Sequence, residues 1–316
     1  MPISPRTTGL LAALVTVVAW TSFIVGSKAL ALRSLQPLDV AAVRVLFASA
    51  ILLPWGWLLC RRRAAVVGAG RAGTWLGLSP LPFRTSAWLG LLGGLAFPLC
   101  AYHAFLFAPA SHGSVLMPGL LPLWTAVLSV LVLRERLGLQ RALGLGLVLA
   151  GGVTVASQSL GQAGAGNQAW KGDLLFMTAS FSWAVFTILC RRWQVPAIEG
   201  NIALMTFVCV TLLPAYALLV ALGAVDSGLA RAPWAEVLTQ GVLQGWLSVV
   251  VSGIGFVKMV QSFGAVRSTM ITALVPGLSA VCAMALLGEP LSWGVVAGLV
   301  CVTAGIFVGV RGAAAR

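Results

Sequence analysis

Two stretches of the chain, LPLWTAVLSVLVLRERL (121–137) and VPGLSAVCAMALLGEPL (275–291), follow one pattern. Each has a proline in its second position, continues as an uncharged and largely apolar run, and reaches a glutamate thirteen residues after the proline. At one offset of 154 residues the matches are Pro122 with Pro276, Glu135 with Glu289, Gly144 with Gly298, and Gly151 with Gly305. Four matches at a single offset indicate that the chain contains an internal repeat.

The composition places this repeat in a membrane. Of the 316 residues, 59% are hydrophobic and 9% charged, with a mean hydropathy of +1.00, whereas about 25% of an ordinary soluble domain is charged. Apolar runs long enough to cross a bilayer must satisfy their backbone groups internally as helices. The predicted spans are 9–32, 38–59, 86–107, 113–133, 139–157, 173–190, 200–222, 236–260, 266–287 and 291–310. The first run has no small-residue cleavage site and is read as a span rather than a signal peptide.

The repeat extends toward the start of each half. Trp20 and Lys28 correspond to Trp183 and Arg191 at an offset of 163, and Asp39 corresponds to Glu199 at 160. Each half therefore carries five spans, and because five is odd, the second half enters the membrane in the opposite orientation. The sequence predicts an all-α membrane protein with ten transmembrane helices as two inverted five-helix repeats, a construction found in secondary carriers. We expect the repeats at residues 1–158 and 172–316, joined by a periplasmic linker at 159–171.

The positive charges predict the orientation. If the N-terminus is cytoplasmic, 15 of the 20 Lys and Arg residues fall on the cytoplasmic side, which is the positive-inside pattern of an inner (plasma) membrane protein with both termini cytoplasmic. The net charge of +13 is then an orientation signal. A nucleic-acid partner is not expected, since its surface would need basic residues gathered on one folded face.

The chain resembles the drug/metabolite transporter superfamily, and specifically its EamA-type ten-helix members. The resemblance lies in Trp20 to Lys28, in Pro37 to Arg44 and in the two Pro-to-Glu stretches, and it covers nearly the whole chain. It implies a central cavity lined mainly by the first, third, fourth, sixth, eighth and ninth helices, which opens to the two sides of the membrane in turn. It also implies a cargo among amino acids, drugs and other metabolites, often moved outward.

Charged residues within the predicted spans are the first candidate site residues. Lys28 lies late in the first span and Arg44 early in the second, so both should lie near the outer surface. They could hold a carboxylate or phosphate. Alternatively, Arg44 could pair with Asp39 and Lys28 could extend to the interface. Lys258, near the inner end of the eighth span, is either an inner counterpart or an interfacial residue.

A histidine and three tryptophans are further candidates. His103 and its neighbour Tyr102 lie deep in the third span; His103 could contact the solute or exchange a proton, or it could bind a backbone carbonyl. Trp20, Trp124 and Trp183 lie on helices that the resemblance assigns to the cavity, where their rings could stack on a solute or only pack the core.

Prolines and glutamates form a group with structural or gating roles. Pro118, Pro122 and Pro276 free backbone carbonyls within the membrane, which could assist gating or line the cavity. Glu135 and Glu289 end the fourth and ninth spans on opposite sides, either as loop anchors or as matching gates. The glycine pairs 90/94, 241/245 and 294/298 have the spacing of close helix crossings, although such pairs also occur by chance among 36 glycines.

The leading functional prediction is a secondary transporter, an exporter of small metabolites such as amino acids. No carboxylate lies in the middle of a predicted span, so neutral, zwitterionic or anionic solutes are favoured over cations, and His103 is the candidate if protons drive transport. A multidrug exporter and a non-transporting scaffold stay open. An intramembrane enzyme is disfavoured, because the chain has no HExxH, GxSxG or paired intramembrane aspartates. We expect no metal and no cofactor, and six cysteines that pack singly.

Overall fold

The computed structural model describes residues 5–31, 33–67, 74–163 and 166–314. Within these ranges the helices are α1 Pro5–Leu30, α2 Pro37–Val67, α3 Phe83–Leu89, η2 Gly90–Ala96, α4 Phe97–Phe107, α5 Ala110–Ser114, η3 Val115–Gly119, α6 Leu121–Leu133, α7 Leu139–Gly161, α8 Ala169–Arg192, α9 Ala197–Ala221, α10 Trp234–Gln240, η5 Gly241–Val251, α11 Ser252–Thr272, α12 Val275–Leu287 and α13 Trp293–Ala314. The η elements are wider π-helical turns within longer helices. Residues 164 and 165 of the predicted linker lie outside the described ranges, and the repeat boundaries stay a prediction.

In the described part of the chain, ten helical segments are long and apolar enough to cross a membrane, as the sequence predicted. Three of the spans are composite: α3–η2–α4, α5–η3–α6 and α10–η5–α11. The ends of the predicted spans agree with those of these segments within a few residues. The second segment is an exception, because it extends to Val66 and the predicted span ended at residue 59. Prolines directly precede four of the helices, where the missing N–H removes no intrahelical bond: Pro82, Pro109, Pro196 and Pro233.

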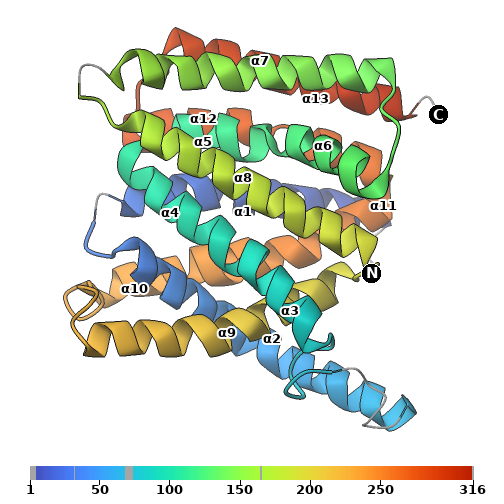
Figure 1. Cartoon of the computed structure of the whole chain (residues 1–316), viewed down its shortest axis with the longest axis vertical. Coiled ribbons are helices and arrows are strands. Elements are labelled where there is room, and N and C mark those ends of the chain that lie inside the picture. Colours follow the sequence, from blue (N-terminus) through green and yellow to red (C-terminus); the bar gives the residue numbers. More distant parts are fainter. Residues whose placement is uncertain (1–4, 32, 68–73, 164–165, 315–316) are drawn as a thin grey trace.

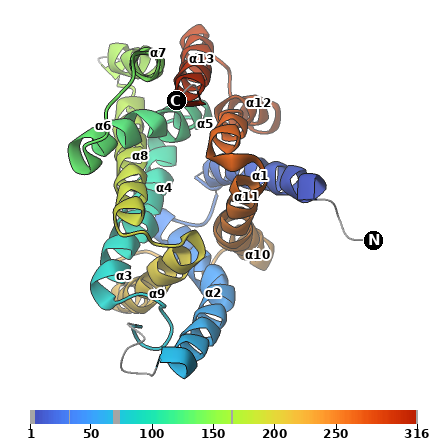
Figure 2. The same cartoon turned by 90° about the vertical axis from the view of Figure 1, so that its right-hand side faces the viewer.

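The helices run roughly parallel to one direction, and α1 begins and α13 ends at the same end of the bundle (Figure 1). We call this end the N-terminal face; it also carries the end of α8 and the start of α9. The opposite end, where α1 ends and α2 begins, is the far face. Figure 2 looks onto the N-terminal face, with α1 and α11 on one side and α4 and α8 on the other.

Glycine contacts between α7 and α13 reveal the two-fold relation of the halves. These helices pack side by side along their length (Figures 1 and 2). A Cβ added to Gly144 would lie 2.5 Å from the carbonyl oxygen of Gly305, and one added to Gly151 would lie 2.6 Å from that of Gly298. The sequence offset pairs Gly144 with Gly298 and Gly151 with Gly305. Each contact is therefore the image of the other when the halves are exchanged, as inverted repeats require.

A second contact has the same symmetry. An added Cβ at Gly90 would meet the Phe207 ring at 2.4 Å, and one at Gly241 would meet the Phe47 ring at 2.4 Å. Helix pairs repeat likewise: α1 packs on α11 as α8 packs on α4. All three glycine pairs flagged in the sequence lie at close contacts, with the third meeting α7 through Gln158 and Val155. Glycine is needed there because side chains of the neighbouring helix occupy the space that a methyl group would take.

Candidate functional site: a central cavity

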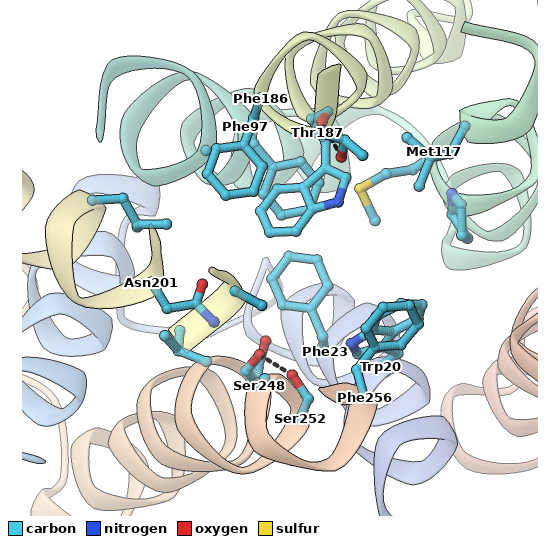
Figure 3. A pocket seen from close by; sticks show the side chains of 18 of the residues that line it. Trp20, Phe23, Phe97, Met117, Phe186, Thr187, Asn201, Ser248, Ser252 and Phe256 are labelled. Carbon is cyan, nitrogen blue, oxygen red and sulfur yellow. Dashed lines mark hydrogen bonds between the residues drawn. The ribbon is translucent and has the colours of Figure 1, made fainter. Parts of the chain in front are cut away.

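A cavity of about 390 Å³ lies between the two halves (Figure 3). This volume is within the usual range of small-molecule pockets, about 300–1,000 Å³. Eight of the ten described spans contribute to its lining, and α7 and α13 do not. The six helices implied by the family resemblance all contribute; α2 and α9 contribute as well, through Arg44 and through Ala197, Asn201 and Leu204.

Aromatic rings form most of the cavity wall. On the α4–α8 side, the Trp183 ring lies 4.8 Å from Phe97 and 4.9 Å from Phe186, centroid to centroid. On the α1–α11 side, Trp20 stacks on Phe256 at 5.8 Å. In Figure 3 these two walls face one another across the cavity, with Phe23 between them. Such faces favour a flat apolar ligand body.

The polar lining is sparse. Ser252 already donates to the Ser248 carbonyl at 2.6 Å, and Thr187 donates to the Trp183 carbonyl at 2.8 Å. The Asn201 amide from α9 points toward the cavity in Figure 3. These hydroxyl and amide groups are uncharged and can form hydrogen bonds with a bound solute.

Among the residues that the structure describes, Arg44 is the only charged one that lines the cavity. The residue is 7% exposed, and its Nη1 atom is buried without a hydrogen-bond partner. The guanidinium carbon lies 5.5 Å from the centroid of the Phe23 ring, a cation–π distance. The predicted alternative, a pair with Asp39, is not formed: the Asp39 carboxylate accepts bonds from Tyr216, from the Gly228 amide and from the Gln36 amide.

The cavity extends to the N-terminal face. Its lining includes Cys190 at the end of α8, Val195 in the following turn and Ala197 at the start of α9. Ala197 is exposed at the surface. The cavity therefore approaches solvent at this end of the bundle.

Toward the far face, polar contacts between the halves close the bundle. Tyr102 of α4 donates to Gln244 of η5 at 3.2 Å, and Gln244 in turn donates to Ser27 of α1 at 3.2 Å. Farther out, His112 of α5 bonds Asp173 of α8 at 2.9 Å, and Ser159 also donates to Asp173. None of the described residues that line the cavity lies at the far-face end of a helix, so these contacts separate the cavity from the far face.

Lys28 and Glu289 hold the break between α4 and α5 at the far face. The Lys28 ammonium donates at 2.9 Å to the Phe105 carbonyl in the last turn of α4 and at 3.0 Å to the carbonyl of Ala108, which caps that helix. The Glu289 carboxylate accepts from the Ala110 and Ser111 amides at 3.0 and 3.2 Å, which are the first amides of α5. Both contacts also suit the helix termini electrostatically. We call this arrangement the far-face clamp.

The pseudo-equivalent pair at the N-terminal face is arranged differently. Arg191, which corresponds to Lys28, donates to Glu135 at 2.5 Å and to the Ser129 hydroxyl at 3.2 Å. Glu135 itself corresponds to Glu289, and both follow a residue in the left-handed conformation, with φ of 56° at Arg134 and 68° at Gly288. The two glutamates thus leave their helices in the same way but bind different partners.

The sequence candidates separate into three groups. Trp20, Arg44, Pro118 and Trp183 line the cavity. Lys28 and Glu289 form the far-face clamp, and Glu135 lies at the N-terminal face. The remaining candidates lie outside the cavity lining: Tyr102, His103, Pro122, Trp124, Lys258 and Pro276.

Contacts explain several of the placements outside the cavity. The His103 Nδ1 atom lies 2.8 Å from the Leu99 carbonyl. Trp124 packs edge-on against Phe181 with ring centroids 5.5 Å apart. Lys258 is exposed. Pro276 is buried, and it begins α12 just as Pro122 begins α6.

Sequence reasoning did not single out several cavity residues. Phe23, Phe97 and Phe256 carry no signal of their own, because phenylalanine is common in apolar spans. Asn201 carried a usable signal, since an amide within a span that has few polar groups is costly unless it has a function or a partner. The spacing of Ser248 and Ser252, one helical turn apart, marks a common face in the same way.

Comparisons with known proteins agree with this architecture. The model of the EamA-like transporter family matches residues 7–157 and 170–311. The chain belongs to the EamA-like transporter family. Its two matched stretches correspond to the two halves of the bundle, so the EamA-like fold accounts for the duplication. As a family member the chain is a transporter-type membrane protein.

A solved crystal structure supports the same fold. It is 18% identical to this EamA-like chain, with a TM-score of 0.53, and the alignment covers 96% of this chain and 97% of the other. At this identity the likeness concerns the fold alone. The chain has no match among curated proteins.

Proposed function

We propose that the protein is a secondary transporter that exports small organic metabolites by alternating access. One observation carries the proposal: the cavity lies between two inverted halves, approaches the N-terminal face and is sealed toward the far face. Pseudo-equivalent halves give a second state of similar energy, in which the sealed and open ends exchange.

The two clamp arrangements support such an exchange. In the present state, Lys28 and Glu289 bind the ends of α4 and α5, while Arg191 and Glu135 bind one another. In the exchanged state, Lys28 would bind Glu289, and Arg191 and Glu135 would bind the chain at the kink of α11. That kink lies at Gly264, with φ 78° and ψ 163°, which is 154 residues after Ala110, the first residue held by Glu289.

Helix packing agrees with this assignment. At the far face, α5 packs on α12 and α1 contacts both α4 and α5. The pseudo-equivalent contacts at the N-terminal face would join α11 to α6 and to α8. Among the described residues, these helix pairs touch weakly or not at all. The far end is held by packing that the N-terminal end does not have.

We further propose that the N-terminal face is cytoplasmic and that the membrane is the inner membrane. The excess of Lys and Arg on this side supports the orientation. Phosphatase and fluorescent-protein fusions at the C-terminus test it: fluorescence without phosphatase activity is expected, and the reverse result would contradict it. In this orientation the cavity is open to the cytoplasm, where an exporter loads its solute.

The transport proposal is tested in proteoliposomes. Purified protein should exchange labelled amino acids or related metabolites across the membrane, and lipophilic cations should not be exchanged. Exchange of the cations alone would favour a multidrug exporter, and no exchange of any solute would favour a scaffold.

A pair of leucine variants connects transport with the cavity. Gly93 lines the cavity, and a Cβ there would lie 2.8 Å from the Phe186 ring, whereas a Cβ at Gly277 would meet nothing within 4 Å. Gly93→Leu should abolish exchange and Gly277→Leu should retain it. Equal activity of the two variants would contradict a route through this cavity.

A further inference from the structure

We propose that the cavity binds an organic anion, with its carboxylate at Arg44 and a flat aromatic body between the Trp20 and Trp183 walls. The inference rests on the proposed transport function and specifies the chemical class of the solute.

The charge balance of the cavity is the first observation. None of the described residues that line the cavity is Asp or Glu, so this lining carries one positive charge and no negative one. The Tyr102 phenol donates to Gln244 and its oxygen can accept a hydrogen bond from the guanidinium, but a neutral phenol supplies no counter-charge. A buried cation without a counterion is costly in an apolar environment. An anionic ligand would remove that cost on binding.

Comparison with the other cations strengthens this reading. Lys28 donates to two backbone carbonyls, and Arg63 and Arg191 each pair with a glutamate. Arg44 takes part in none of the ion pairs among the described residues. Its Nη1 atom has no hydrogen-bond partner in the protein, and at 7% exposure the residue is largely shielded from solvent. A purely structural arginine would be expected to bind carbonyls or a carboxylate, as these three do. A ligand carboxylate is the missing acceptor.

The walls determine the rest of the molecule. Rings from both halves bound the cavity, so a planar ligand body can pack between them while its carboxylate reaches Arg44. Guanidinium stacking on Phe23, at 5.5 Å, keeps the charged group beside this aromatic surface. A volume of about 390 Å³ is suited to a single ring system with a short acidic side chain rather than to a large drug.

The same lining disfavours a positive group. An ammonium would find only neutral acceptors, because the lining oxygens belong to hydroxyl, amide and carbonyl groups, and it would be repelled by Arg44. For one ring system, affinity should therefore fall in the order anion, zwitterion, cation.

Three indole compounds test this order by isothermal titration calorimetry on the purified full chain at pH 7.5: indole-3-propionate, tryptophan and tryptamine. We expect indole-3-propionate to bind at least about tenfold more tightly than tryptamine, since a hydrogen bond to a charged group is worth about one to two powers of ten in affinity. Arg44→Gln should weaken propionate binding by that factor and leave tryptamine unchanged or tighter. Arg44→Lys should retain part of the preference, and the control Arg231→Gln, which removes an exposed arginine outside the cavity lining, should retain all of it.

Several results would overturn the proposal. Equal affinities for the three compounds would do so, as would binding of none of them at millimolar concentration. A preference that survives in Arg44→Gln would show that Arg44 does not bind the anion, and a loss of thermal stability with an unchanged preference would make its role structural. Because binding is measured without transport, bound anion without exchange in proteoliposomes would contradict the proposed function alone. Exchange of metabolites by a protein that shows no anion preference in calorimetry would contradict this proposal alone.

Discussion

If the two clamps exchange, removing the charge of one glutamate should shift the balance between the two states. Glu289 accepts two backbone amides, at 3.0 and 3.2 Å, only in the state that is closed at the far face. Charge-assisted hydrogen bonds are roughly twice as strong as neutral ones, so Glu289→Gln should weaken these contacts by about 2 kcal/mol. In the other state the variant loses an ion pair with Lys28. The pseudo-equivalent Arg191–Glu135 pair has side chains 50% and 34% exposed, and a pair of this kind is worth at most about 1 kcal/mol.

Glu289→Gln therefore costs the state closed at the far face about 1–2 kcal/mol more than it costs the state open there. This difference changes the ratio of the two populations about 5–30-fold in favour of the open state. By symmetry, Glu135→Gln should shift the ratio by a similar factor in the opposite direction. The double variant should return close to the starting ratio, because both states then lose one clamp and one ion pair.

Electron–electron resonance distances between spin labels measure this ratio in lipid nanodiscs. Suitable label positions are Phe107 at the end of α4 and Leu286 near the end of α12, which are 38% and 73% exposed, in a background without the native cysteines. The longer distance should become more populated in Glu289→Gln and less populated in Glu135→Gln. Shifts of both variants in one direction, or no shift in either, would refute the exchange of clamps.

Three further predictions concern stability and the cavity wall. Gly144→Ala should lower the melting temperature, because the added methyl group would lie 2.5 Å from the α13 backbone and overpacking costs about 1–3 kcal/mol. The control Gly146→Ala, which has open space around it, should leave stability unchanged or raised, and equal melting temperatures of the two variants would contradict the close crossing of α7 and α13. Asp173→Asn should destabilise the fold by about 1–3 kcal/mol, because it alters a buried group that forms hydrogen bonds with His112 and Ser159. Asp226→Asn, in a pair whose aspartate is 80% exposed, should cost less than about 1 kcal/mol, and chemical unfolding compares the two. Trp183→Ala should weaken solute binding by about tenfold or more through the loss of its ring contacts, and calorimetry showing undiminished affinity would remove this ring from the site.

Asymmetry between the two ends is the main physical feature of the molecule. Two nearly equivalent halves could form a bundle that is closed at both ends or open at both ends. Instead, the clamp and the packing of α5 on α12 close one end, and the same chemical groups leave the other end open. Alternating access needs this property, since solute must reach the cavity from one side at a time.

The sequence by itself determined the helices and their two-fold relation. With 9% charged residues, the chain can satisfy its backbone in lipid only as helices. The offset between Pro122 and Pro276 predicted the duplication, and an odd number of spans per half fixed the inversion. These features follow from local composition and spacing, so they are readable without coordinates.

Only the tertiary structure decided which side chains face the cavity. Helices that are apolar all round have no polar face to report their rotation, so packing against neighbours sets it. Arg44 and Trp183 therefore turn inward, whereas Lys258 turns outward and His103 binds the backbone of its own helix. The sequence did not reveal which end is open, because that depends on long-range contacts such as those of Glu289 with α5.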